Sequence, residues 1–434
     1  MKEEGLIRAV GVRGLTAGIV NYTIGAGIFV LPALVAAKVG GAAPVVYLIC
    51  AVAMGLIVLC FAAAGSRVSE SGGAYAYAEV AFGPYVGFMV AISLWMSTIL
   101  ASAAVANVFV DSLSQLSPSI GTPVIRASII LLLYLALTVI NVRGVRIGSN
   151  VVQTVTVAKL APILILIAAG VFAIKSSNLA WPGMPNAADT ARAVILLIFA
   201  FMGVESALIA GGEVENPART VPVAIFTALG FVALLYIGIQ VVTQGILGAE
   251  LATNTKAPLA AAAKMVLGRG GELLVVAGAA ISTLGYVAGD MLAAPRMLFA
   301  LGRDSLLPRP TASVHERYRT PHVAIVIHAI FCAVLAITGT FEALGVLVVL
   351  LTLLVYLSAC LASIQLQRRN VRADGAVPFT LPGGPVIPIL ATAIIIWLMS
   401  NSTQQEALAL VAMMVVSTLV YFLMRARRPV VAAA

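Results

Sequence analysis

Apolar segments long enough to cross a lipid bilayer follow one another along almost all of the 434 residues. A membrane-spanning helix needs about 20 mostly apolar residues, and a window of that length finds twelve segments. They cover residues 14–39, 43–65, 85–111, 124–142, 148–174, 191–212, 222–247, 271–300, 321–339, 342–367, 385–402 and 405–425. Inside hydrocarbon the backbone must satisfy its own hydrogen bonds, which favours helices. The sequence therefore predicts an all-α integral membrane protein with 12 transmembrane helices.

The composition excludes most soluble classes of protein. Hydrophobic residues make up 61% of the chain and charged residues 10%, far from the usual soluble balance. A net charge of +9 therefore need not indicate a nucleic-acid partner, and none is expected. Neither His315 nor His322 has metal-ligand spacing, and no phosphate-binding GxxxxGK[ST] sequence is present. We expect no metal and no cofactor. All four cysteines lie in apolar runs and are expected to pack there: Cys50, Cys60, Cys332 and Cys360.

The distribution of positive charge predicts the orientation of the chain. With both termini in the cytoplasm, 18 of the 26 lysines and arginines fall in cytoplasmic segments and seven fall outside. Lys159 alone remains within a span. Cytoplasmic loops of membrane proteins carry an excess of Lys and Arg. We expect a multi-pass protein of the cytoplasmic membrane with cytoplasmic N- and C-termini.

The first apolar segment is interrupted in its middle by the sequence IGAGIF, residues 24–29, shortly before Pro32. Glycine weakens a helix, and non-helical backbone at membrane depth is tolerated only where it is buried in protein or lines a cavity. The sixth segment has a similar interruption at FMGVES, residues 201–206. Paired interruptions in two halves of a membrane protein indicate the binding site of a secondary transporter.

Four stretches of this chain resemble the amino acid–polyamine–organocation (APC) transporter superfamily, in family order and spacing. They are GAGIFVLP (25–32), SGGAYAYAEVAFGP (71–84), FAFMGVESALIAGGEVENPARTVP (199–222) and PRMLFALGRDSLLP (295–308). The resemblance implies one transporter domain, 1–434, with the LeuT-like five-plus-five inverted repeat. Helices 1–5 (14–174) would form the first repeat and helices 6–10 (191–367) the second, with helices 11 and 12 (385–425) appended. The substrate would bind between the broken helices 1 and 6.

The two predicted breaks offer backbone groups to a substrate. Free N–H groups at a helix N-terminus favour a carboxylate, and exposed carbonyls accept hydrogen bonds from an amine. Together they would bind the backbone of an amino acid without a charged side chain. The expected binding residues are Ile24, Gly25, Ala26, Gly27 and Ile28 in helix 1, and Phe199, Ala200, Met202 and Gly203 in helix 6. The alternative is that Gly25 and Gly27 only allow close helix packing.

Lys159 is the one lysine or arginine assigned to neither side of the membrane, because it lies near the middle of the predicted span 148–174. An ammonium near the bilayer centre costs about 2.5–3.5 kcal/mol on insertion scales, so it should face the protein interior. In proton-coupled relatives a lysine at this position replaces the sodium ion of sodium-coupled members. The resemblance implies as partners a helix 1 carbonyl near Gly25 and the hydroxyl of Ser282 or Thr283. Burial favours the neutral amine and carbonyl partners favour the ammonium, which suits a proton-coupling role. The alternative is that Lys159 extends to the cytoplasmic surface.

Three further polar residues are candidates for the substrate site. Glu205 stands where family members that exchange cationic substrates carry a glutamate, either as a proton-responsive carboxylate or as a structural hydrogen-bond acceptor. Asp290 departs from the family pattern, and it would pair with a cationic substrate, with Lys159 or with Arg296. Ser102 replaces the asparagine of the arginine exchangers, so arginine specificity does not carry over.

The sequence thus favours a secondary active transporter of amino acids that works by alternating access, with proton symport through Lys159. The expected partners are an amino acid or amine substrate, protons and the lipid bilayer. An exchanger of cationic amino acids or polyamines, using Glu205 and Asp290, is the nearest alternative. A channel and a sensor that binds without transport also remain open. We do not expect an enzyme, because no nucleophile–base or metal constellation is present.

Overall fold

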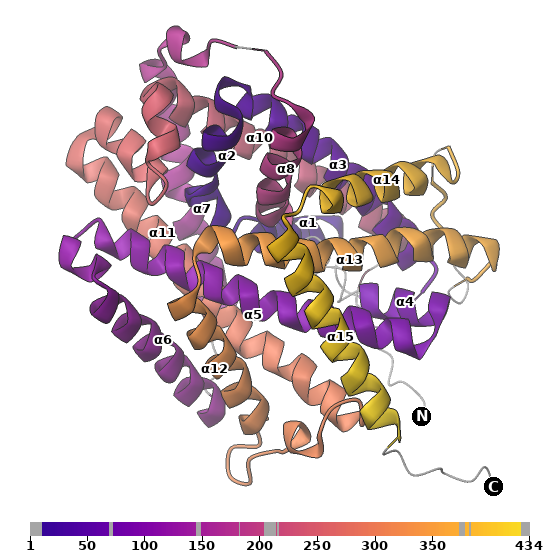
Figure 1. The fold of residues 1–434 in the computed structure, drawn as a ribbon. Helices are drawn as coiled ribbons and strands as arrows, with labels where there is room; N and C mark the ends of the chain where they lie inside the picture. The colour runs from indigo at the N-terminus through magenta and orange to yellow at the C-terminus, as the bar shows by residue number, and fades with distance from the viewer. Residues whose placement is uncertain are drawn as a thin grey trace, which may run out of the picture.

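The computed structural model describes residues 11–68, 73–144, 149–181, 183–203, 214, 217–372, 378–381 and 383–426. Helices make up most of this part of the chain (Figure 1). The first half contains α1 (Val12–Thr23), α2 (Leu31–Val39), α3 (Ala43–Gly65), α4 (Ala74–Phe82), α5 (Pro84–Ser114), α6 (Pro123–Arg143) and α7 (Ser149–Gly170). The second half contains α8 (Ala187–Phe201), α10 (Pro217–Leu247), α11 (Pro258–Arg303), α12 (His322–Thr338), α13 (Phe341–Arg368), α14 (Val386–Ser400) and α15 (Gln404–Ala426).

Each predicted span contains a helix in its described part. The span 14–39 is divided into α1 and α2, and the described helix of the span 191–212 ends at Phe201. By length and composition, seven helical segments in the described ranges can cross a membrane. They are Leu31–Gly65, Pro84–Ser114, Pro123–Arg143, Arg219–Thr253, Pro258–Arg303, Phe341–Arg368 and Gln404–Ala426. Lys159–Ala173, His322–Thr338 and Val386–Ser400 are apolar but shorter. The fold is that of a multi-pass helical membrane protein.

Two helical features fall between the predicted spans. Helix α4 lies between Gly73 (φ 57°) and Gly83 (φ 91°), and these left-handed conformations favour glycine. Within α11, Gly268 (φ 65°, ψ −158°) interrupts the helix. The residues from Pro258 up to this point form a short helical segment of their own.

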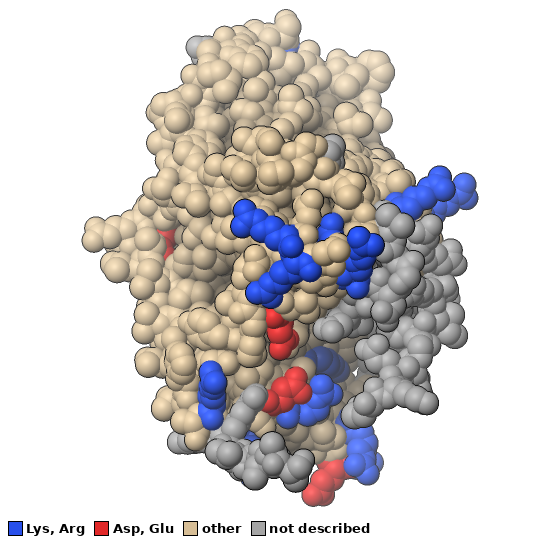
Figure 2. Space-filling view, turned by 90° about the vertical axis from the view of Figure 1, so that its right-hand side faces the viewer, with Lys and Arg blue, Asp and Glu red and all other residues tan. Residues whose placement is uncertain are grey.

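Apolar side chains cover the outside of the bundle as well as its core. On the peripheral helix α6, Leu131, Leu132 and Leu135 are exposed, and α15 exposes Val415, Val416 and Leu419. Figure 2 shows large continuous areas of one face without a charged residue. Such a surface suits lipid rather than water.

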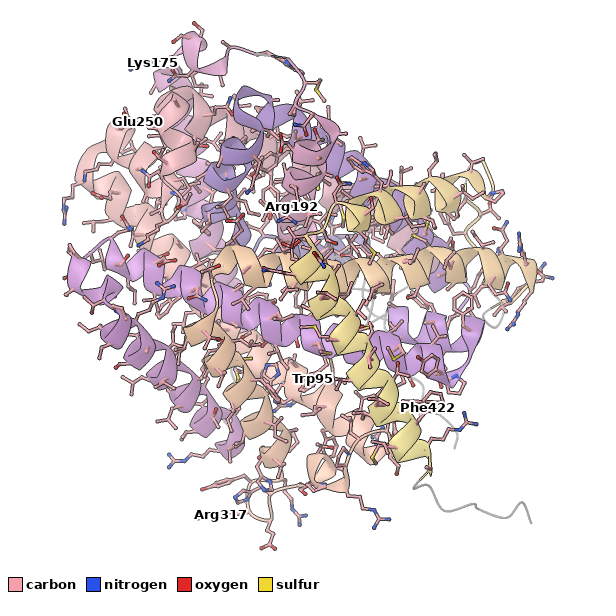
Figure 3. All side chains as sticks on the ribbon, viewed as in Figure 1. Trp95, Lys175, Arg192, Glu250, Arg317 and Phe422 are labelled. Atoms are coloured by element: carbon pink, nitrogen blue, oxygen red, sulfur yellow. The ribbon has the colours of Figure 1, made fainter. Side chains whose placement is uncertain are left out.

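The ends of the bundle carry the loops that the charge pattern assigned to opposite sides of the membrane. Lys175 and Glu250, from loops expected outside, lie together at one end (Figure 3). Arg317, from a loop expected in the cytoplasm, lies at the opposite end. The arrangement fits a bundle that spans a bilayer from one of these ends to the other.

Candidate solute-binding site

The predicted break in the first span is present. Helix α1 ends at Thr23, Ile24 leaves the helical conformation (φ −78°, ψ 86°), and a short 3₁₀ turn, η1 (Gly27–Phe29), precedes α2. Pro32 stands in the first turn of α2, where its missing N–H costs no helical hydrogen bond. The first N–H groups of a helical turn have no partner within it, so the start of η1 offers donors.

The predicted break in the sixth span begins directly after Phe201. Helix α8 ends there, Met202 is extended (φ −63°, ψ 157°), and Gly203 has a φ of 113°. Residues 204–213, including Glu205, lie outside the described residues. The role expected for Glu205 therefore stays a prediction.

The two breaks touch each other at Gly203. A Cβ atom built on this glycine would lie 2.9 Å from the carbonyl carbon of Tyr22 and 3.0 Å from the amide nitrogen of Thr23. The positive φ and this backbone approach both require glycine. On the other side, a Cβ on Gly27 would lie 3.1 Å from the ring of Phe199. A glycine in each of the two unwound segments, Gly27 and Gly203, therefore allows these segments to pack together.

Tyr236 of α10 joins the two broken helix ends. Its hydroxyl lies 3.0 Å from the carbonyl oxygen of Thr23, at the end of α1, and 3.0 Å from that of Ala200, near the end of α8. The side chain is fully buried. Sequence reasoning missed this residue, because a tyrosine within an apolar span carries no signal that separates it from packing aromatics.

A cavity of about 150 Å³ opens beside the two breaks. The broken helices contribute Tyr22, Thr23, Gly25, Ala26, Gly27, Phe199, Ala200, Met202 and Gly203. The remaining walls are Leu94, Ser97, Thr98, Ala101 and Val105 of α5, Ala74 of α4, and Tyr286 and Met297 of α11. None of these lining side chains is an acid, a lysine or an arginine. Among its described residues, the cavity thus combines backbone polar groups with side chains that carry no charge.

The cavity takes in seven of the residues predicted for the substrate site: Gly25, Ala26, Gly27, Phe199, Ala200, Met202 and Gly203. Ile24 and Ile28 are fully buried in the hydrophobic core and do not line it. Phe199 packs edge-on against Phe341 of α13, with ring centroids 5.3 Å apart. The cavity-lining Phe199 therefore also contacts α13.

Lys159 is buried, with 7% of its surface exposed, and does not extend to the molecular surface. Its ammonium donates a hydrogen bond of 2.6 Å to the carbonyl oxygen of Asn21, one turn before Gly25. The carbonyl partner on helix 1 thus agrees with the expectation. The expected hydroxyl partners differ. Thr283 donates to carbonyls of its own helix, and the hydroxyl of Ser282 is buried without a hydrogen-bond partner.

Asp290 and Ser102 have partners outside the cavity. The Asp290 carboxylate lies 2.9 Å from Nε2 of His328 on α12, so it is paired neither with Lys159 nor with Arg296, as the sequence had suggested. The Ser102 hydroxyl lies 3.1 Å from that of Tyr134 on α6. Neither residue lines the cavity.

A multi-pass helical protein with a small-solute cavity between two broken helices belongs to the class of membrane transporters. The comparison with known families agrees, because the sequence profile of the amino acid permease family matches residues 10–424. This chain is a member of that family. It is therefore a permease for amino acids or related solutes, and not an enzyme.

Three relatives from Bacillus subtilis (strain 168) align over most of their length. The chain is 30% identical to a methylthioribose transporter, over 97% of this chain and 94% of the relative. It is 26% identical to the branched-chain amino acid permease BcaP, over 97% and 94%. It is 27% identical to the serine/threonine exchanger SteT, over 90% of each chain.

Proposed function

We propose that this protein is a proton-coupled symporter of a neutral amino acid in the cytoplasmic membrane. The observation that carries the proposal is the cavity at the contact of the two breaks, where backbone groups meet described lining side chains that carry no charge. The termini would be cytoplasmic. Residues 14–174 and 191–367 would form inverted repeats, and alternating access would come from rocking of one helix bundle around the cavity.

Backbone groups would recognise the parts that all amino acids share. The amides of Ala26, Gly27 and Ile28 stand at the start of a helical turn and favour a carboxylate. The exposed carbonyls of the broken helices would accept hydrogen bonds from the amino group. Dipoles fixed by the fold need no reorganisation when the substrate arrives, so this arrangement supports specific binding.

The cavity wall favours a substrate with an uncharged side chain. Ser97, Thr98 and Tyr286 offer hydroxyls, while Val105 and Phe199 offer apolar surface. A cationic substrate would leave its charge without a carboxylate among the described lining residues, which costs free energy in a site of low dielectric. Asp290 is already paired with His328. The relatives named for branched-chain amino acids and for serine and threonine fit this preference.

Lys159 would couple the proton to the movement of helix 1. A charged ammonium holds the Asn21 carbonyl by a charge-assisted hydrogen bond, roughly twice as strong as a neutral one. Loss of the proton would weaken this bond directly before the break that binds substrate. The protonation state of Lys159 and the position of the α1 end would then depend on each other, as reciprocal linkage requires.

Uptake into proteoliposomes that hold no internal amino acid tests this proposal. The panel contains labelled branched-chain amino acids, serine, threonine, arginine, a polyamine and methylthioribose, each with and without an inside-alkaline pH gradient. We expect saturable accumulation of a neutral amino acid only when the gradient is imposed. Uptake that requires preloading would instead establish an exchanger, non-saturating flux a channel, and binding without uptake a sensor.

A further inference from the structure

Three metal-ligating side chains converge behind the wall of the cavity. His328 and Cys332 are four residues apart on α12, a spacing that places both side chains on one helix face. Asp290 reaches them from α11. The carboxylate lies 2.9 Å from His328 Nε2, and Cys332 Sγ lies 3.4 Å from the same nitrogen. One ligand atom from each residue fits within 4.8 Å of the others.

Hydrogen bonds among the three side chains do not satisfy all of them. His328 Nε2 carries at most one proton, so it can donate to Asp290 or accept from Cys332, but not both. His328 and Cys332 are fully buried, and the Asp290 side chain is 5% exposed. A carboxylate in this position is costly unless its charge is balanced. A positive centre between the three atoms would balance this charge and contact all three side chains.

A divalent cation balances the charge of this cluster. The Asp290 carboxylate and a Cys332 thiolate each contribute one negative charge and the His328 imidazole is neutral, so the complex with a dication is neutral. On binding, the thiol releases its proton to water. The set of one oxygen, one nitrogen and one sulfur ligand suits zinc, which accepts all three, and disfavours calcium and magnesium, which prefer oxygen alone.

The surroundings of the cluster supply further polar groups and a route of entry. The hydroxyls of Ser102 and Tyr134, which contact each other, neighbour Cys332 from α5 and α6. They can complete or support the coordination. Tyr286 precedes Asp290 by one turn of α11 and lines the solute cavity. The cluster is therefore separated from this water-accessible space by a single helical turn.

We propose that Asp290, His328 and Cys332 form a zinc site that ties α11 to α12 within the group of helices α5, α6, α11 and α12. From the sequence we expected no metal site and a packing role for Cys332. The His-x₃-Cys spacing at 328–332 supplies only two of the three ligands, and the third, Asp290, lies on another helix. This site is independent of the solute cavity and of proton coupling, so the transport proposal can fail while the zinc site stands.

The test uses the full chain, purified in detergent without a histidine tag and stripped with a chelator. After Zn²⁺ is added and excess removed, mass spectrometry should find about one zinc ion per chain. Cys332→Ser and Asp290→Asn should each weaken zinc binding by more than about tenfold. Cys50→Ser replaces another buried cysteine, outside the cluster, and should bind zinc like the unaltered chain.

Cobalt provides a second reading of the same site. With Co²⁺ in place of Zn²⁺, we expect thiolate-to-cobalt charge-transfer absorption that Cys332→Ser loses and Cys50→Ser keeps. If a variant fails to fold, the unaltered protein still tests zinc binding, because Zn²⁺ should raise its melting temperature and Mg²⁺ should not. A chain that retains no zinc, or a Cys332→Ser variant that binds it unchanged, would overturn the proposal and leave a hydrogen-bonded Asp–His pair.

Discussion

The ammonium of Lys159 donates a hydrogen bond of 2.6 Å to the carbonyl oxygen of Asn21. This bond connects α7 to α1 just before the helix breaks. Helix α7 also packs closely against α11, since a Cβ on Gly278 of α11 would lie 2.5 Å from Pro162 of α7. The lysine is thus fixed between elements that carry the cavity, and any change in its charge acts on the end of α1.

Replacing Lys159 with alanine should separate coupling from transport. The variant removes the ammonium that donates to the Asn21 carbonyl, so we expect exchange of substrate to continue while accumulation driven by a pH gradient falls to the level without a gradient. Counterflow and gradient-driven uptake in proteoliposomes measure the two activities. Lys175→Ala removes an exposed lysine at one end of the bundle and should leave both activities intact. Concentration of substrate by Lys159→Ala under a proton gradient would contradict the coupling role.

Tyr236→Phe should destabilise the junction of the two broken helices. The change removes the hydroxyl shared by the carbonyls of Thr23 and Ala200, and a buried group left unsatisfied costs about 1–3 kcal/mol. We expect a lower melting temperature and weaker substrate binding, measured by thermal unfolding and by titration. Tyr47→Phe is the matched control, because the Tyr47 hydroxyl is buried without a hydrogen-bond partner. Equal effects of the two substitutions would show that Tyr236 serves only as a packing residue.

How much of the structure the sequence predicts depends on whether a feature is set locally or by contacts between distant helices. Spans and breaks are local: hydropathy locates helices such as α5 and α13, and glycines near Pro32 locate the break in α1. Partners of buried polar residues depend on which faces of distant helices meet. Asp290 and His328 are 38 residues apart on different helices, and nothing in either local pattern selects the other. Tyr236 and Thr23 show the same limit, since their contact exists only after α10 packs against α1.

Arg192 and Glu406 should contribute stability without affecting substrate choice. The guanidinium forms two hydrogen bonds with the carboxylate, 2.6 and 3.0 Å long, joining α8 to the start of α15 (Figure 3). Both side chains are partly exposed, at 23% and 17%, so solvent screens the pair. Arg192→Ala should lower stability by about 1 kcal/mol. A double-mutant cycle with Glu406→Ala, read by thermal unfolding, measures the coupling. Additive effects of the two substitutions would exclude a stabilising pair.

Gly27→Val should abolish substrate binding with little loss of folded protein. The added Cβ would stand 3.1 Å from Cδ1 atoms of Leu31 and Phe199, and both are side chains that can shift. The branched side chain would however occupy space beside the amides proposed to bind the substrate carboxylate. We expect the dissociation constant, measured by titration calorimetry, to rise more than about a hundredfold, which corresponds to about 2.7 kcal/mol.

Gly18→Val provides the comparison for this experiment. It introduces the same side chain within α1 at a residue that does not line the cavity, and apart from the backbone of its own helix no described atom lies within 4 Å of the added Cβ. Because β-branched residues lower helix propensity only slightly, binding and folding should change little. If Gly27→Val also bound substrate with an unchanged dissociation constant, the carboxylate would not lie against the amides of Ala26, Gly27 and Ile28. Recognition would then depend on side chains of α5 and α11 instead of the unwound backbone.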